Sequence, residues 1–276
     1  MSHVNEFVVL DKSYLEGASG QEIRELASCK KLLMPSALFY ELMTTSPEQR
    51  RKCFRKLPPG DNPVTLVEHI GILLTHEVAT GSPAGLPSDH CIKFPFQFNT
   101  KLLNDDYQLP PDALDAVNEQ TQEVEEDIER LINFSETMGQ LFPDVLLGRS
   151  NLVEEARRSA FSTIADAVWI HAFYDHVRAN ASEVHPCPEI KGAPMSWAHI
   201  RWLQVNLIFA LDLHIRHGGR LRRNLTPDLR LRLEHDVHDA QLLVFGVLQG
   251  ALATREKKLT RWHALLLGTD GGVCRL

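Results

Sequence analysis

Two short apolar runs near the start of the chain limit the folds that are open to it. Residues 6–10 read Glu-Phe-Val-Val-Leu and stop at Asp11, and residues 31–34 read Lys-Leu-Leu-Met and stop at Pro35. Apolar runs of this length, bounded by a polar residue or a proline, are typical of buried strands. A third run, Ala251 to Thr254, lies near the other end of the chain. These runs predict a small sheet assembled from both ends of the chain.

Most of the sequence between these runs predicts helices. Ser19 precedes one short helix, and Pro35-Ser36 opens another that carries Glu41 in its second turn. Apolar residues at helical spacing predict further helices over residues 64–80, 112–131, 151–177, 196–217 and 229–249. Residues 81–111 are rich in proline and glycine and predict an irregular crossing.

We therefore expect an α/β fold, with a parallel sheet flanked by helices and a large all-α insertion. Residues 1–46 and 226–276 would form the two parts of the α/β domain, and residues 47–225 the helical insertion. The length of 276 residues suits one large domain or two modest ones.

The net charge of −7 is concentrated in one segment. Residues 112–130 hold eight acids and one base, so this segment alone carries −7 and the remainder is balanced. Two stretches are basic, since residues 214–232 carry +5 and residues 47–56 carry +4. This distribution argues against a protein that grips nucleic acid with its whole surface, but it is compatible with a polyanionic substrate.

Cysteine usage and hydropathy indicate the compartment. The five cysteines form an odd set without a Cys-x-x-Cys pair, so neither a disulfide framework nor a cysteine-type zinc site is indicated. No apolar run reaches the roughly 18–20 residues that a membrane-spanning helix needs, and the first residues do not read as a secretory leader. A cytoplasmic protein with no membrane association is expected.

Four carboxylates at the ends of predicted elements carry the chemical prediction. Asp11 follows the first run, Glu41 lies in the helix after the second, Asp239 lies in the long helix 229–249, and Glu256 follows the last run. The carboxyl ends of parallel strands share one edge of a sheet, so these acids are expected to converge there. Converging carboxylates repel one another unless a cation lies between them, and hard Mg²⁺ or Mn²⁺ ions prefer oxygen ligands.

The same residues carry a resemblance to a known family. The segments 7–15 (FVVLDKSYL), 33–42 (LMPSALFYEL), 239–240 (DA) and 250–256 (GALATRE) are similar, in this order, to the PIN (PilT N-terminus) domain of metal-dependent nucleases. The resemblance implies a central parallel sheet between helices, a carboxylate cluster that binds Mg²⁺ or Mn²⁺, and cleavage of RNA. It covers residues 5–46 and 226–262. The chain departs from the family at Glu256, where aspartate is usual, and in the long separation of 198 positions from Glu41 to Asp239.

Roles follow for the residues of this site. Asp11, Glu41, Asp239 and Glu256 are the expected catalytic metal ligands. Asp236 shares a helix face with Asp239 and is a further metal-ligand candidate. Ser13 and Thr254 are expected as supporting groups beside a metal-bound water. The nucleic-acid-binding candidates are Arg216, Arg220, Arg222 and Arg223, which precede the helix that carries Asp239. An equal alternative is that these arginines pair with the acidic segment 112–130.

Three functions stay open from the sequence. The first is a metal-dependent endoribonuclease, in which metal ions activate a water and stabilise the leaving oxygen of an RNA phosphodiester. The second is a non-catalytic PIN-like protein that binds a protein partner, or a second copy of itself, through the helical insertion. The third is the toxin component of a toxin–antitoxin pair. The sequence contains no phosphate-binding glycine loop and no serine-hydrolase elbow, which disfavours nucleotide-cofactor and serine-hydrolase chemistry.

Overall fold

We describe the fold from a computed structural model of the chain. The structure describes residues 6–60, 62–92, 100–104, 111–181 and 186–268. Contacts divide the chain into two compact units. The first comprises Met1–Leu73, Gly85–Gln120 and Gln241–Leu276, and the second comprises Leu74–Ala84 and Thr121–Ala240.

The first unit is built on a four-stranded sheet in which every pairing is parallel. The strands are β1 (Phe7–Leu10), β2 (Lys31–Pro35), β3 (Thr65–Val67) and β4 (Leu252–Ala253), in the order β3-β2-β1-β4. Val9 of β1 is opposite Leu33 on one side and Leu252 on the other. The predicted α/β class with a parallel sheet drawn from both ends of the chain is therefore confirmed.

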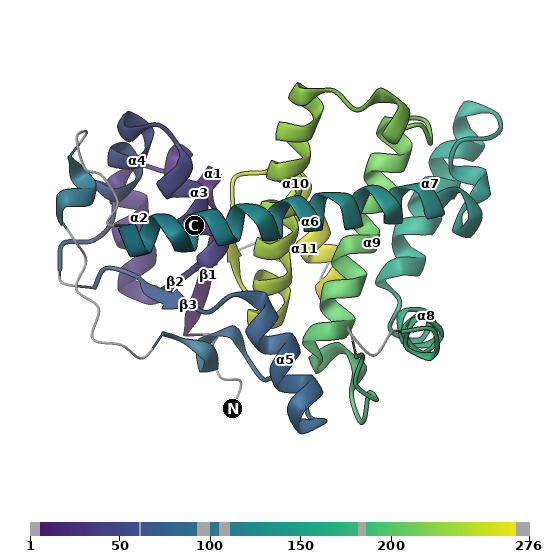
Figure 1. Ribbon diagram of the computed structural model, residues 1–276, viewed down its shortest axis with the longest axis horizontal. Helices are drawn as coiled ribbons and strands as arrows, with labels where there is room; N and C mark the ends of the chain where they lie inside the picture. The colour runs from purple at the N-terminus through teal and green to yellow at the C-terminus, as the bar shows by residue number, and fades with distance from the viewer. Residues whose placement is uncertain (1–5, 61, 93–99, 105–110, 182–185, 269–276) are drawn as a thin grey trace. The chain divides into compact units, whose positions relative to one another are not determined.

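Short helices connect and cover these strands. They are α1 (Lys12–Gly17), α2 (Gly20–Cys29), α3 (Ser36–Thr44), α4 (Pro47–Phe54) and α11 (Lys257–Leu267), and α1 to α4 lie beside β1, β2 and β3 in Figure 1. The predicted cap at Ser19 is present as a capping box, in which Ser19 and Glu22 each accept a backbone N–H of the other. Leu10, Leu15 and Leu38 are fully buried in the core that these elements share.

One predicted helix begins too early. Residues 64–80 were expected as one helix, but Thr65–Val67 form β3 and the helix α5 covers only Ile70–Thr80. A short apolar run does not reveal by itself whether it is strand or helix. Here pairing with β2 decides, since Leu33 is opposite Thr65 and Met34 is opposite Leu66. Strand β3 lies within the segment 47–225 assigned to the insertion, so the sheet extends along the chain beyond residue 46.

The second unit is helical. Its helices are α6 (Pro111–Leu141), α7 (Ser150–Ala165), α8 (Ala167–Ala179), α9 (Ala198–Arg216) and α10 (Pro227–Gln249), of which α6 begins and α10 ends in the first unit. Short 3₁₀ turns lie at Pro87–His90, Thr100–Leu103, Pro143–Val145, Pro194–Ser196 and Arg222–Asn224. None of the helices within the described residues is long and apolar enough to cross a lipid bilayer.

A second predicted helix is in fact two. Residues 151–177 were expected to form one helix, but α7 ends at Ala165 and α8 begins at Ala167. Asp166 between them has extended backbone angles, and its carboxylate accepts the N–H groups of Val168 and Trp169 at 3.0 and 2.8 Å. This is an N-cap interaction, and it starts a new helix at Ala167. The apolar pattern of residues 151–177 has no break here, so it does not reveal this boundary.

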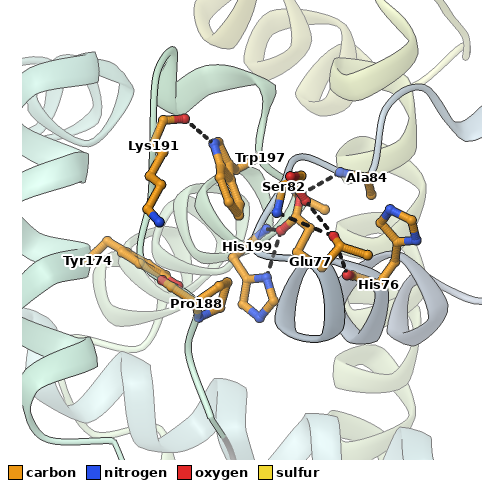
Figure 2. Close-up of polar contacts among 11 residues, drawn as sticks. His76, Glu77, Ser82, Ala84, Tyr174, Pro188, Lys191, Trp197 and His199 are labelled. Atoms are coloured by element: carbon orange, nitrogen blue, oxygen red, sulfur yellow. Dashed lines mark hydrogen bonds and ion pairs between the residues drawn. The ribbon is translucent and has the colours of Figure 1, made fainter.

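A buried carboxylate organises the second unit. Glu77 of α5 is 0% exposed, and it accepts the backbone N–H groups of Ala84, Ala198 and His199 at 3.1, 2.6 and 2.9 Å (Figure 2). Its Oε2 also lies 2.7 Å from Nδ1 of His199. Helix α9 begins at Ala198 and its N-cap residue, Trp197, makes no side-chain cap. Glu77 therefore acts as the cap of α9 from a distant part of the chain, where the helix dipole favours a negative charge.

We predict that Glu77→Ala lowers the free energy of unfolding of the second unit by on the order of 3 kcal/mol, because it leaves buried N–H donors without an acceptor. Urea unfolding measures the loss. Hydrogen exchange locates it, since the amides of Ala84, Ala198 and His199 should exchange faster. The exposed Glu189→Ala serves as the control, and equal losses in both variants would contradict the assignment.

Candidate functional site

The candidate site lies where the order of the strands reverses. From β1 the chain proceeds outward through β2 and β3, whereas β4 pairs with the opposite side of β1. In open parallel sheets, ligands bind outside the carboxyl ends of the strands at such a switch point. Asp11 is the first residue after β1, and Thr254 is the first residue after β4. The topology therefore places these two residues at the edge of the sheet where a ligand is expected.

Asp11 is hydrogen-bonded to residues from the first and the last part of the sequence. Its side chain is only 2% exposed, and its Oδ2 accepts a hydrogen bond from the hydroxyl of Thr254 at 2.6 Å and another from the hydroxyl of Ser13. The backbone N–H of Asp11 donates to the carbonyl oxygen of Ala253 at 3.1 Å. Asp11 occupies the N-cap position of α1 but makes no side-chain capping bond. Its carboxylate is held by Ser13, the second residue of α1, and by Thr254, which follows β4.

The two hydroxyl groups are oriented by the backbone that follows β4. The N–H of Arg255 donates to Ser13 Oγ at 3.0 Å, and the N–H of Glu256 donates to Thr254 Oγ1 at 3.0 Å. A hydroxyl carries one proton and accepts through its lone pairs. Both hydroxyl groups donate their proton to Asp11, and each oxygen accepts a backbone N–H through a lone pair. Ser13 and Thr254 lie where the sequence predicted supporting groups, and they support the carboxylate itself.

The electrostatic state of Asp11 follows from this environment. Burial raises the pKa of Asp11, the hydroxyl groups of Ser13 and Thr254 oppose that rise, and the charge of Glu41 adds to it. Glu41 is thus close enough to repel the Asp11 carboxylate. A buried carboxylate with a second carboxylate nearby is stabilised by a cation.

A lysine partly supplies that cation. Lys12, the first residue of α1, places Nζ 3.1 Å from Oε1 of Glu41, and both side chains are largely buried, at 17% and 13% exposed. Glu41 comes from the second turn of α3, as predicted. Lys12 was not among the residues predicted for the site, although its position directly after Asp11 could have indicated that it lies there.

The other predicted ligands are placed as follows. Glu256 is the N-cap residue of α11, but its side chain makes no capping hydrogen bond. Its backbone N–H donates to the hydroxyl oxygen of Thr254. Asp239 and Asp236 lie on α10 in the second unit. Among the described residues, no group of three or more His, Cys, Asp or Glu side chains is gathered so as to hold a metal ion. The first unit brings together two carboxylates, Asp11 and Glu41, with two hydroxyl groups, an all-oxygen set of the kind that Mg²⁺ and Mn²⁺ prefer.

The second unit pairs its basic stretch with its own acids. Arg216 lies 2.8 Å from Asp236 and 2.8 Å from Asp212; burial opposes the charge of Arg216, but these two carboxylates raise its pKa. Arg222 contacts the acids of α6 through Glu129 and Glu136, at 3.5 and 3.3 Å.

Arg230 extends this pairing, since it contacts Glu125 and lies 3.2 Å from Glu129. The pairing alternative therefore describes Arg222 and Arg230. Arg220 and Arg223 are exposed, and the described part of the chain offers them no ion-pair partner.

Comparisons with protein-family models, with curated protein sequences and with solved structures found no match to this chain. The candidate site is therefore defined by its own geometry and by the resemblance of the short motifs.

We predict that Asp11→Asn stabilises the protein more at pH 7 than at pH 4. A carboxyl group whose pKa is raised by folding contributes stability below its unfolded-state pKa of about 3.9, and that contribution is lost as the pH rises through the folded-state pKa. The asparagine amide does not ionise, so the variant avoids this loss. Urea unfolding at the two pH values measures the difference. The exposed Glu155→Gln is the control, and a difference for Asp11→Asn that is independent of pH would contradict the prediction.

Proposed function

We propose that the protein is a PIN-like, metal-dependent nuclease that hydrolyses RNA phosphodiesters. The observation that carries the proposal is the Asp11 carboxylate, buried at the strand switch point and within charge range of Glu41. Two repelling carboxylates on a ligand-binding edge form a site for a divalent cation. The order of the acids in the sequence, which resembles the PIN pattern, supports the same reading.

Asp11 and Glu41 would hold the Mg²⁺ or Mn²⁺, and Glu256, which precedes α11 in the same unit, is the further ligand proposed from the resemblance. Bound there, the ion supplies an activated water and neutralises charge on the leaving oxygen. Ser13 and Thr254 keep the Asp11 carboxylate in one orientation, since their hydroxyl groups both donate to Oδ2. Lys12 forms an ion pair with Glu41, and this pair would have to separate for Glu41 to bind the cation.

We predict that Asp11→Asn abolishes Mn²⁺-dependent cleavage of RNA, with a loss of roughly a thousandfold or more, while the protein remains folded. The amide keeps the shape of the side chain and can still accept the two hydroxyl bonds, but it removes the charge. Cleavage of a labelled single-stranded RNA in Mn²⁺ measures the effect. Glu155→Gln removes an exposed acid of the second unit and should cleave as the unaltered protein does. Equal cleavage by Asp11→Asn would refute the proposed mechanism.

A non-catalytic interaction protein is the second candidate, and one observation favours it. The ion pair between Lys12 and Glu41 already neutralises one of the two carboxylates of the first unit. A PIN-like site that has exchanged its metal ion for a lysine would keep its shape and lose its chemistry.

Lys12→Gln separates the two candidates. If the site takes a metal, removal of the competing ammonium takes one positive charge away from Glu41, and we predict that Mn²⁺ binds several-fold more tightly in titration calorimetry. The double variant Lys12→Gln/Asp11→Asn should lose that binding. Absence of Mn²⁺ binding in both the unaltered protein and Lys12→Gln would favour the interaction protein.

A further inference from the structure

A groove of about 400 Å³ lies between α1 and α4 in the first unit. Its wall comes from the last turn of α1, from α4, and from the two residues that follow α4. The lining residues are Glu16, Gln49, Lys52, Cys53, Arg55 and Lys56. Three bases thus face one acid, and all three bases belong to the +4 stretch of residues 47–56.

The three bases remain available to an anion. Arg55 is exposed and has no ion-pair partner among the described residues. Lys52 pairs with Glu48 at 2.7 Å, but both side chains are more than 60% exposed, so water screens this pair. Lys56 donates to the carbonyl oxygens of Leu15 and Glu16 at 2.7 Å each, which fixes its ammonium at the groove and uses two of its three N–H donors.

Apart from Glu16, the remaining wall carries no negative charge. Burial raises the pKa of Cys53 to about 11, with a smaller contribution from Glu16. The thiol is therefore neutral at pH 7. Gln49 is uncharged, and its Oε1 accepts the hydroxyl of Thr45 at 2.9 Å. The single lining acid, Glu16, belongs to α1, and its Oε1 lies 4.0 Å from Nζ of Lys12.

Lys12 connects this groove to the candidate site. Its Nζ lies 3.1 Å from Oε1 of Glu41 and 4.0 Å from Oε1 of Glu16. The two carboxylates are therefore no more than about 7 Å apart. Glu41 belongs to the candidate site and Glu16 lines the groove, so the groove lies next to the candidate site.

We propose that the groove between α1 and α4 binds the phosphate backbone of the single-stranded RNA substrate. This inference rests on the proposed function and names the surface that positions its substrate. The groove has the volume of a site for one small molecule, roughly 300–1,000 Å³, and so accepts a short stretch of one strand and not a duplex. Lys52, Arg55 and Lys56 contact phosphates, which gives affinity without base preference. The nucleic-acid-binding role that the sequence assigned to Arg216 is reassigned to this groove, because the largely buried carboxylates of Asp212 and Asp236 already pair with its guanidinium group.

The test measures how tightly the protein binds a fluorescein-labelled oligouridylate of about 12 nucleotides. Fluorescence anisotropy reports the binding, and EDTA in the buffer prevents cleavage. We predict that Lys52→Gln/Arg55→Gln binds roughly tenfold more weakly at about 50 mM salt. The slope of log K against log salt should fall in magnitude by about 1.4, since each phosphate contact on a single strand contributes about 0.7. An oligoadenylate of the same length should show the same loss.

Arg158→Gln/Lys191→Gln is the matched control. It removes two exposed positive charges from the second unit, so the net charge changes equally. Unchanged binding by this control supports the groove. An equal loss in both double variants, or no loss in either, overturns the inference. If polyglutamate displaces the RNA and shows the same dependence on Lys52 and Arg55, the groove belongs to an acidic protein partner and the inference is likewise overturned.

Cleavage in Mn²⁺ separates this inference from the proposed function. If the unaltered protein binds the oligonucleotide in a groove-dependent way and does not cleave it, the groove stands and the nuclease proposal fails. If the unaltered protein cleaves and the groove variant binds and cleaves equally well, the nuclease stands and the groove fails.

Discussion

The buried carboxylate of Asp11 is the constraint around which the sheet edge is organised. A carboxylate removed from water is stable only if donors or cations replace its hydration. Here the donors are hydroxyl groups from Ser13 and Thr254, which are 241 residues apart in the chain. Each hydroxyl oxygen in turn accepts a backbone N–H from the residues that follow β4. The first and last strands are thereby joined through the residue that the candidate chemistry requires.

The same constraint links stability to function. Two hydroxyl bonds only partly offset the burial of Asp11, and Glu41 adds repulsion, so the pKa of Asp11 stays raised. A cation at this edge relieves both effects. Lys12 supplies one positive charge to Glu41 from within the chain, whereas a divalent ion would supply two charges to both carboxylates. The balance between this ammonium and an external ion is the physical difference between the nuclease and the interaction protein.

Charge in the second unit is handled in two other ways. Glu77 is fully buried and is satisfied by backbone N–H groups at the start of α9, which converts a charge into a structural cap. The acids of α6 are exposed and are paired with Arg222 and Arg230. The stretch around residue 220 therefore serves in part to neutralise the acidic helix. Arg220 and Arg223 stay exposed, but the basic stretch around α4 lies in the unit that holds Asp11, which makes it the better surface for a polyanion that reaches this carboxylate.

The local sequence determined the strands β1, β2 and β4, most helix starts, the placement of Asp11 and Thr254 directly after strands, and that of Ser13 beside Asp11. These features depend on residues adjacent in the chain, such as an apolar run stopped by an acid or a serine before a helix. Tertiary structure alone decided that Thr65–Val67 form a strand, that Lys12 holds Glu41, and that Glu77 caps α9. Each of these depends on a partner far along the chain, and no local pattern specifies which distant strand, acid or helix end will be its neighbour.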